Sequence, residues 1–194
     1  MEDLRNTSEE MSTKEKVLAA LFENLPEDAE GVATIERQEI DRLAEQGVSV
    51  EDICHEFVRR GFLLHGTGVS GLDTLEPRQA NDEGGYEENI QNAVYATDDY
   101  RIPIFMALKS NLSGKSGYSI TSSQHEDGTY GENTSFSATF VIPSDKIGYV
   151  YVLPKDTFEV AGSDSQFVSY LPVSPRFVIP VTLSDFPYSI ELEK

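Results

Sequence analysis

The sequence predicts an α+β protein in which a helical N-terminal cap, residues 1–60, precedes a strand-dominated domain, residues 61–194. Before residue 61, apolar residues recur three and four positions apart, which is the spacing of amphipathic helices. After residue 61, the apolar runs become short and rich in β-branched and aromatic residues. Gly, Pro, Ser and Asn stand between them, as in strands joined by turns. A chain of 194 residues can bury a substantial hydrophobic core.

Three helices are expected in the N-terminal cap, at residues 14–24, at about 34–46 and at 50–60. Pro26 follows the first helix, and Gly47 ends the second. Ser49 and Asp52, three residues apart, approximate a capping box. The third helix is therefore expected to start after Ser49 and to end at Gly61.

Six strands are expected in the second region, at residues 62–64, 93–96, 135–142, 147–153, 166–171 and 176–183. The clearest is 135–142, where apolar and polar residues alternate as they do in a strand with one buried face. One further helix is expected at residues 98–109, with Pro103 near its first turn. Residues 110–133 are rich in Ser and Gly without periodicity, so we expect a solvated loop that contains His125.

The chain has a large excess of acidic residues, 34 Asp and Glu against 15 Lys and Arg, which gives a formal charge of −19. An average surface of this charge repels DNA and RNA, so a nucleic-acid partner is not expected. Residues 40–53 do resemble a helix-turn-helix, but residues 1–60 hold 16 acids against 7 bases, and a major-groove helix of that charge would meet phosphate repulsion. We therefore expect these helices to pack against the domain or to bind a protein partner.

The sequence carries no signal for a membrane or for secretion. It has no apolar run of about 18 to 20 residues, and its first residues lack the basic-then-apolar order of a signal peptide. A single cysteine, Cys54, excludes an internal disulfide and fits a reducing compartment. One cysteine and three histidines also argue against a structural zinc site. We therefore expect a cytoplasmic protein without a membrane or metal partner.

The strongest candidate for a functional site follows the first apolar run of the second region. His65 comes at the end of this predicted strand, and Gly66 and Thr67 come next. A glycine lets a ligand approach the main chain, and a threonine adds a hydroxyl group beside the imidazole. Some thirty residues later a second apolar segment contains Tyr95 and leads into the expected helix. Together these residues favour a ligand-binding site over a role in the core.

The order of these motifs resembles the diphtheria-toxin and poly(ADP-ribose) polymerase branch of the ADP-ribosyltransferases. The resemblance covers about residues 61–109, and it implies a split β-sheet fold for the second domain and NAD as a substrate. It implies that His65 binds a ribose hydroxyl and that the main chain of Gly66 pairs with the nicotinamide carboxamide. It also implies that Tyr95 packs on one face of the nicotinamide ring and Phe105 on the other.

The sequence departs from this family at the position of the catalytic glutamate. The family's late strand begins with Glu, an aromatic residue and apolar residues before Tyr, and residues 166–170 fit this order with Gln166 in the first place. A carboxylate stabilises the oxocarbenium-like charge that develops when the nicotinamide–ribose bond breaks, and glutamine brings no charge. Glu159 is the best substitute carboxylate, with surface exposure as its alternative. Arg78 suits a phosphate, because a guanidinium can bind it through two hydrogen bonds, with an isolated surface position as the alternative.

Three functions follow as alternatives. The first is an NAD-binding ADP-ribosyltransferase-like protein that performs mono-ADP-ribosyl transfer or NAD hydrolysis with a weakened site, or that only binds NAD or ADP-ribose. The second is a non-catalytic interaction protein on a degenerate transferase fold, whose acidic surface or helical cap engages a basic protein. The third, an RNA 2′-phosphotransferase-like activity, needs a basic cleft, which the charge of −19 argues against.

Overall fold

A computed structural model of the protein describes residues 11–26, 31–79, 91–110, 112, 118–121, 134–161 and 166–192. Within these ranges the chain forms four α-helices, eleven strands and one short 3-10 helix. In chain order the elements are α1 (Thr13–Asn24), β1 (Ala33–Thr34), α2 (Arg37–Glu45), α3 (Val50–Arg59), β2 (Leu63–Thr67), β3 (Arg78–Gln79), β4 (Asn92–Thr97), α4 (Ile102–Lys109), β5 (Tyr118–Thr121), β6 (Ser135–Ala138), β7 (Gly148–Leu153), β8 (Glu159–Val160), β9 (Gln166–Ser169), β10 (Phe177–Val181), η2 (Leu183–Asp185) and β11 (Ile190–Leu192). The predicted α+β class is confirmed.

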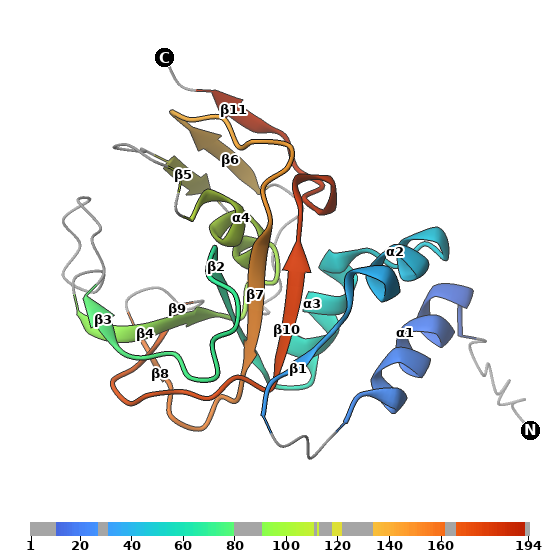
Figure 1. Ribbon diagram of the computed structural model, residues 1–194, viewed down its shortest axis with the longest axis horizontal. Coiled ribbons are helices and arrows are strands. Elements are labelled where there is room, and N and C mark those ends of the chain that lie inside the picture. The colour runs from blue at the N-terminus through green and yellow to red at the C-terminus, as the bar shows by residue number, and fades with distance from the viewer. Residues whose placement is uncertain are drawn as a thin grey trace, which may run out of the picture.

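Most strands join one large sheet, in the order β1-β10-β7-β2-β4-β9-β8, with β3 also paired to β4 (Figure 1). β1 pairs with β10 in parallel, and the other neighbours in this sheet are antiparallel. A second sheet has the order β11-β6-β5 and lies above α4 in the view of Figure 1. The strands that carry His65, Tyr95 and Gln166 (β2, β4 and β9) are therefore neighbours in the large sheet.

The helices of the N-terminal cap begin and end close to the predicted residues. α3 starts with the predicted capping box, in which the main-chain N–H of Asp52 donates to Ser49 Oγ at 3.1 Å. α2 begins at Arg37, three residues later than predicted, because the two residues before Ile35 form β1. The main-chain N–H of Ala33 is bonded to the sheet at 3.0 Å, and this bond extends the sheet instead of the helix.

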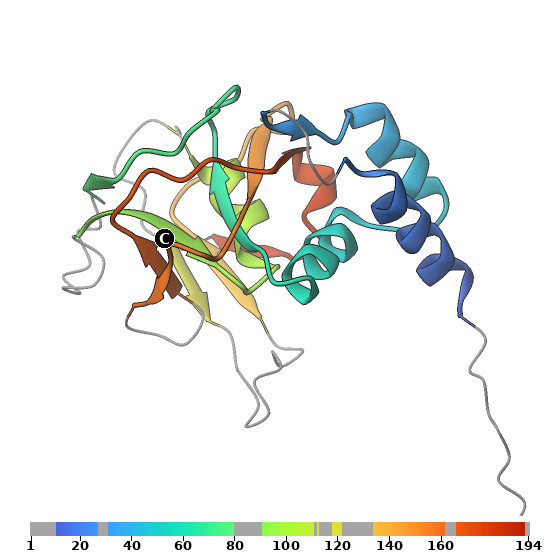
Figure 2. The same ribbon diagram turned by 90° about the horizontal axis from the view of Figure 1, so that it is seen from below.

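One hydrophobic core joins the N-terminal helices to the large sheet. It includes Phe22 of α1, Leu43 of α2, Phe57 of α3, Leu64 of β2 and Ile179 of β10. Figure 2 shows α1, α2 and α3 gathered beside the sheet, and α3 and α4 both contact β2. The division predicted at residue 60 is thus a change in secondary structure, and the core continues across it.

The other face of the large sheet is covered by connecting segments. Leu63, Tyr151 and Phe167 lie in a second buried cluster on this face. Two segments that are far apart in sequence close over them, because Leu75 and Val173 exchange main-chain hydrogen bonds of 2.8 and 3.0 Å. The segment that contains Leu75 follows His65 in the chain. The residues after the candidate site therefore fold back over β2, the strand that carries His65.

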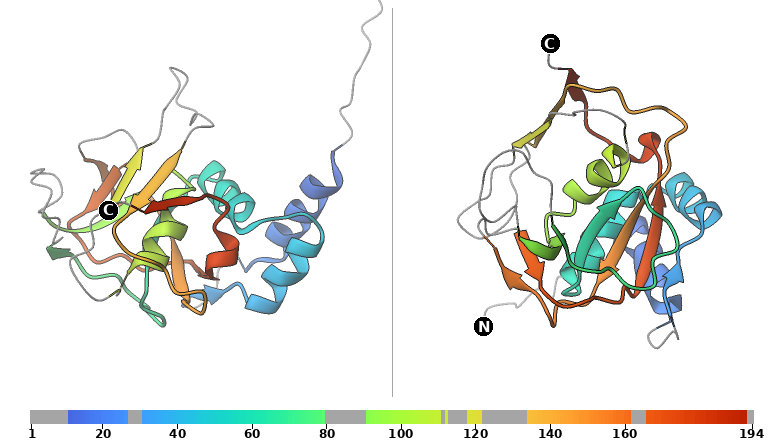
Figure 3. Two further views of the ribbon diagram at one scale, coloured as in Figure 1. Left: turned by 90° about the horizontal axis from the view of Figure 1, so that it is seen from above. Right: turned by 60° about the vertical axis from the view of Figure 1, so that its left-hand side comes forward.

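α4 also packs against the small sheet. The ring of Phe105 in α4 lies 5.2 Å from that of Phe136 in β6, and Figure 3 shows the two sheets around α4. β5 lies within residues 110–133, where the sequence predicted a loop, so that prediction is wrong for β5. Its four residues alternate in burial, but a run this short is hidden among Ser and Gly in the sequence. His125 lies outside the described residues.

Candidate functional site

β4 has two successive partners along one of its edges. Leu64 of β2 pairs with Thr97 at one end of β4, and Arg78 of β3 pairs with Ala93 toward the other. Among the described residues, Leu64–Thr97 is the one pair that joins β2 to β4, although β2 continues to pair with β7 along its other edge. The large sheet is therefore split between β2 and β4. His65, which the sequence placed at a strand end, lies inside β2 where the split begins.

The imidazole of His65 bridges this split. Its Nδ1 lies 2.7 Å from the main-chain carbonyl oxygen of Tyr95. A carbonyl oxygen only accepts hydrogen bonds, so Nδ1 carries the proton and donates it. In the neutral ring Nε2 is then an acceptor, and no described residue donates to it. The site offers this nitrogen to a ligand that carries a hydroxyl group.

The surroundings of His65 favour the neutral imidazole. Burial lowers the pKa of His65 below its ordinary value and outweighs the Tyr95 carbonyl, which raises the pKa. The positive charge of Arg78 lowers the pKa of His65 further. At neutral pH the ring is therefore uncharged, with Nε2 as an acceptor.

The main chain of Gly66 faces the open part of the split. Alternate residues of an antiparallel strand turn their N–H and C=O groups to the same edge. The Tyr95 carbonyl faces β2, since it accepts from His65, so Thr97 faces β2 as well and Leu64 is its hydrogen-bonded partner. Gly66, two residues after Leu64, then turns its N–H and C=O toward β4, where no described strand pairs with it. A donor and an acceptor side by side match a primary carboxamide.

The absence of a side chain at Gly66 also allows close packing against α4, a role that the sequence did not predict. A Cβ atom at this position would lie 2.1 Å from the Pro103 carbonyl oxygen and 2.8 Å from the Ala107 nitrogen, both in α4. Gly148, in the adjacent strand, meets Ala107 of the same helix equally closely. Glycine is thus needed for the close packing of α4. Because α4 fills this space, a ligand that approaches the main chain of Gly66, as the sequence predicts, has to do so from the edge of the strand.

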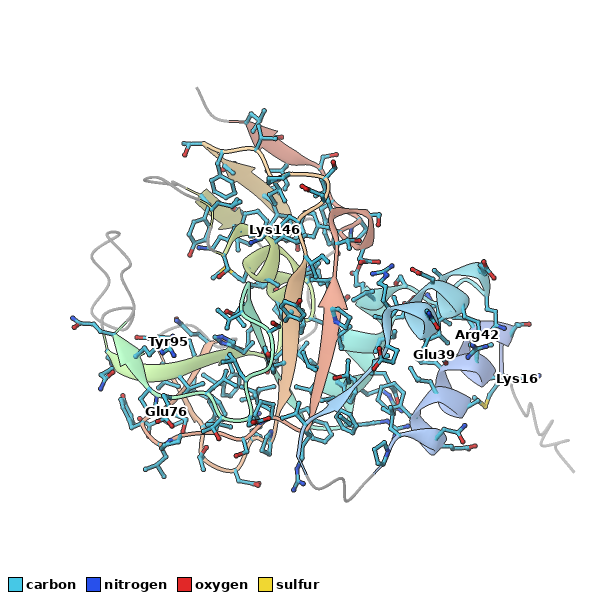
Figure 4. All side chains as sticks on the ribbon, in the orientation of Figure 1. Lys16, Glu39, Arg42, Glu76, Tyr95 and Lys146 are labelled. Atoms are coloured by element: carbon cyan, nitrogen blue, oxygen red, sulfur yellow. The ribbon has the colours of Figure 1, made fainter. Side chains whose placement is uncertain are left out.

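Tyr95 is held in place by its own strand. Its hydroxyl accepts a hydrogen bond from the Gln91 N–H at 3.0 Å and donates one to the Gln91 carbonyl at 3.1 Å. The partly exposed ring packs against a small apolar cluster, Ala93, Ala161 and Val168. Figure 4 labels Tyr95 on the side of the molecule opposite to α1. The ring is therefore fixed at both ends beside the split.

Gln166 and Glu159 project from the same face of the sheet as Tyr95. In the register of the strands, Thr97 is opposite Gln166, and Tyr95 is opposite Val168, which is in turn opposite Glu159. Directly opposite residues of antiparallel strands share a face, and diagonal neighbours lie within reach of long side chains. Gln166 is partly exposed and Glu159 is exposed. The tertiary structure thus gathers these polar groups from three strands onto one face. The residue of β2 opposite Thr97 is Leu64, so the side chain of His65 projects from the other face of the sheet.

Phe105 does not take the position that the resemblance implies for it. Its ring is fully buried, with 0% of its surface exposed, among Tyr118, Phe136, Phe140 and Phe186. It has no surface that could pack on a ligand, so a second aromatic wall is not supplied by this residue. The sequence could not show this, because α4 is apolar around its circumference and carries no polar face that marks the solvent side.

Thr67 and Arg78 lie at the two ends of the segment that crosses the second face. Thr67 is the last residue of β2, and its Oγ accepts from the Val69 N–H at 3.3 Å. Arg78 is exposed on β3. Both are therefore accessible beside His65, and Arg78 brings a positive charge to the rim of the split.

Tyr151 positions the segment after Thr67, and sequence reasoning missed it. Its buried hydroxyl donates to the Val69 carbonyl and accepts from the Leu72 N–H, both at 3.1 Å. Tyr151 stands opposite His65 in the register of β2 and β7. The available signal was a tyrosine with a polar hydroxyl in the middle of an apolar strand, since a buried tyrosine hydroxyl needs a hydrogen-bond partner.

Two pockets formed by described residues lie away from these groups. One has a volume of about 460 Å³ between α1, α3 and the sheet, and the other has a volume of about 410 Å³ beside the segment at residues 172–176. Neither is lined by any of the eight residues predicted from the sequence. Residues 80–90 and 162–165, which adjoin β4 and β9 in the chain, lie outside the described ranges.

The comparisons with known proteins do not identify the chain. No protein-family model matches it, and no curated protein or solved structure matches it. In the part of the chain that the structure describes, no helix is long and apolar enough to cross a membrane, and no group of three or more His, Cys, Asp and Glu side chains is placed to hold a metal ion. The function must therefore be argued from the geometry of the split.

Proposed function

We propose that the protein is ADP-ribosyltransferase-like and binds NAD at the split between β2 and β4. The observation that carries the proposal is the hydrogen bond of 2.7 Å from His65 Nδ1 to the Tyr95 carbonyl. This bond fixes the tautomer that leaves Nε2 as an acceptor, beside the open main-chain groups of Gly66. A split sheet with the motif strands β2, β4 and β9 adjacent supports the finer assignment of the fold.

Each group at the split has a role toward a part of NAD. His65 Nε2 accepts a hydrogen bond from a ribose hydroxyl, and the N–H and C=O of Gly66 bond to the nicotinamide carboxamide. The ring of Tyr95 packs on the nicotinamide, and its hydroxyl bonds to Gln91 keep the ring from turning away. Arg78 neutralises phosphate charge at the rim. NAD enters along the strand edge, since α4 fills the space over Gly66.

The proposed reaction is slow cleavage of the nicotinamide–ribose bond. Nicotinamide leaves with the bonding electrons, and water or an acceptor nucleophile adds to the ribose carbon. Gln166 can hydrogen-bond to the ribose but cannot balance the positive charge that develops there. Glu159 stands on the same face as Gln166, so it is the nearest carboxylate in the register to do so. Mono-ADP-ribosyl transfer and NAD hydrolysis both fit this site.

Calorimetric titration with NAD and with ADP-ribose tests binding directly. We expect a dissociation constant in the range of about 1 μM to 1 mM, as is usual for substrates, and loss of binding in His65→Ala. His55→Ala is the matched control, because the ring of His55 packs against Tyr100 outside the site, with ring centroids 4.6 Å apart, and its loss should leave binding unchanged. Circular dichroism of both variants shows whether the fold is retained. Absence of NAD binding by the folded wild-type protein would overturn the proposal.

Release of nicotinamide from NAD tests catalysis separately. We expect Gln166→Glu to raise the rate by at least about tenfold, since it places a carboxylate beside the developing charge. Gln166→Ala should not raise it. If Gln166→Glu and Gln166→Ala release nicotinamide equally slowly, Gln166 does not face the reacting carbon.

A second function is a non-catalytic interaction protein on the same fold. The exposure of Glu159 and the glutamine at position 166 favour it, because the described residues of β8 and β9 then present no buried carboxylate. A basic protein would be the partner of a chain with a charge of −19. Capture of such a partner by His65→Ala as well as by the wild type, together with absence of NAD binding, would favour this function.

A further inference from the structure

A pocket of about 460 Å³ lies where the N-terminal helices meet the large sheet, apart from the split. Its floor consists of four aromatic rings: Phe22 of α1, Phe57 of α3, Phe177 of β10 and Phe62, which immediately precedes β2. Phe57 of α3 is at the centre, with ring centroids at 4.7 Å from Phe22, 5.8 Å from Phe62 and 5.2 Å from Phe177. In Figure 1, α3 lies beside β10, and α1 lies farther to the right. A flat apolar group can pack on such a floor.

The rim of this pocket is positively charged, although the whole chain has a formal charge of −19. Arg60, Lys155 and Arg176 line it with one acid, Asp156. Within the described residues, neither Lys155 nor Arg176 forms an ion pair, although the Lys155 ammonium lies 4.4 Å from the centroid of the Phe167 ring, which does not line the pocket. In a protein with 34 acids and 15 bases, cations without ion pairs around one pocket form a local attraction for an anion.

Arg60 contributes positive charge although it has an acidic partner. Its Nε donates to Glu56 Oε1 at 2.8 Å, and Arg59 donates to the two oxygens of the same carboxylate at 2.6 and 2.7 Å. One carboxylate shared by two guanidinium groups leaves an excess of one positive charge. The Arg60 guanidinium lies 4.4 Å above the ring of Phe22, so the charge is held directly over the aromatic floor.

Arg176 is placed by the main chain on either side of it. Its N–H donates to the Val152 carbonyl at 2.8 Å, and its carbonyl accepts from Ala33 at 3.0 Å. The side chain is exposed, but its origin is fixed between β1 and β7. The Cα atom of Arg176 is thus fixed beside the pocket, and its exposed side chain lies within reach of the pocket.

We propose that this pocket binds a small anion that joins a flat aromatic body to one phosphate or carboxylate group. The aromatic body packs against Phe62, whose ring is partly exposed, and the anionic group bonds to Arg176 and Arg60. Guanidinium groups bind both kinds of anion through parallel hydrogen bonds. A pocket of this size, at the junction of two structural regions, is within the usual range of about 300 to 1,000 Å³ for small ligands. This site does not depend on the proposed NAD site.

Calorimetric titration with 1-naphthyl phosphate tests the site. We expect it to bind at least about tenfold more tightly than either 1-naphthol or inorganic phosphate alone, since both halves of the pocket are engaged. Arg176→Gln and Arg60→Gln should each weaken binding by about tenfold, through loss of a charge-assisted hydrogen bond. Arg42→Gln is the matched control. Arg42 also pairs with a glutamate three residues away, Glu39, but does not line the pocket, and the affinity of this variant should stay within about twofold of the wild type.

A second comparison separates this site from the split. His65→Ala should bind 1-naphthyl phosphate as the wild type does, whether or not NAD binds the protein. Equal affinity for 1-naphthyl phosphate and 1-naphthol would overturn the proposal, as would equal weakening by Arg42→Gln and Arg60→Gln. Loss of binding in His65→Ala would also overturn it, because the probe would then occupy the split.

Discussion

β2 and β4, which lie on the two sides of the split, are stabilised by different kinds of contact. On the β2 side, Leu64, Val150 and Ile179 are fully buried under α3 and α4. On the face of β4 and β9 that carries Tyr95, Val168 belongs to a cluster of three buried residues among those that the structure describes, and the polar groups beside it are partly or fully exposed. Tyr95 is fixed there by hydrogen bonds to the main chain and not by a deep core. The difference suits a site in which a rigid side positions the main chain and an open side presents polar groups.

The largest effect is expected from the buried ion pair at the start of α4. Asp99 is 0% and Arg101 is 3% exposed, and two hydrogen bonds of 2.9 Å join them. Asp99→Ala leaves the guanidinium without this carboxylate, so we expect a loss of about 3 to 5 kcal/mol in the free energy of unfolding, measured with urea. Glu39→Ala, which breaks an exposed ion pair with Arg42, should cost far less. Similar losses of stability in Asp99→Ala and Glu39→Ala would contradict the expected difference between the buried and the exposed ion pair.

The second largest effect is expected from the packing of β2 against α4. Gly66→Ala places a Cβ 2.1 Å from the Pro103 carbonyl, so we expect a loss of about 3 kcal/mol in stability from overpacking. Gly148→Ala, which meets the same helix, should act in the same direction. Thr67→Ala, one residue along β2 with a partly exposed side chain, is the control and should cost much less. A thermal midpoint of Gly66→Ala equal to that of the wild type would show that α4 does not pack against this strand.

The third effect is a dependence of NAD affinity on pH. The pKa of His65 is below its ordinary value of about 6.5, so the ring stays neutral until the pH falls below that range. Protonation removes the acceptor at Nε2, and we expect affinity for NAD to be constant near neutral pH and to fall in acid. Calorimetry at a series of pH values measures this fall. A rise in affinity as His65 becomes protonated would contradict the assigned tautomer.

The same lowered pKa has a consequence for stability without a ligand. Between the folded and unfolded pKa values of His65 the unfolded chain binds more protons, so the free energy of unfolding decreases as the pH falls below about 6.5. His65→Asn lacks this contribution. The difference in the free energy of unfolding between the wild type and His65→Asn should therefore shrink in acid. A difference that grows in acid would contradict the lowered pKa of His65.

The smallest effect separates the ring of Tyr95 from its hydroxyl. Tyr95→Phe removes two hydrogen bonds to Gln91 and should cost about 1 kcal/mol in stability. The ring remains, so NAD affinity should stay within about twofold of the wild type, while Tyr95→Ala should lose most of it. If Tyr95→Phe binds NAD as poorly as Tyr95→Ala, the hydroxyl and not the ring meets the ligand.

The elements with strong local signals could be predicted from the sequence. The capping box at Ser49 formed as expected, and the strand that contains Tyr95 lies within one residue of its predicted ends. β5 could not be predicted, because four alternating residues among Ser and Gly give too short a pattern. The late start of α2 was also missed, since only the pairing of β1 with β10 draws the preceding residues into the sheet.

The sequence by itself determined the α+β class, most helices and strands, and the motif residues that stand on three of the strands. These follow from periodicity, capping and turn residues, which act over a few positions of the chain. Only the tertiary structure decided that His65 lies within a strand, that its Nδ1 reaches the Tyr95 carbonyl, that Gly66 makes room for α4 and that Phe105 is buried. These depend on strand register and on packing between residues far apart in the chain, and local sequence carries little information about either.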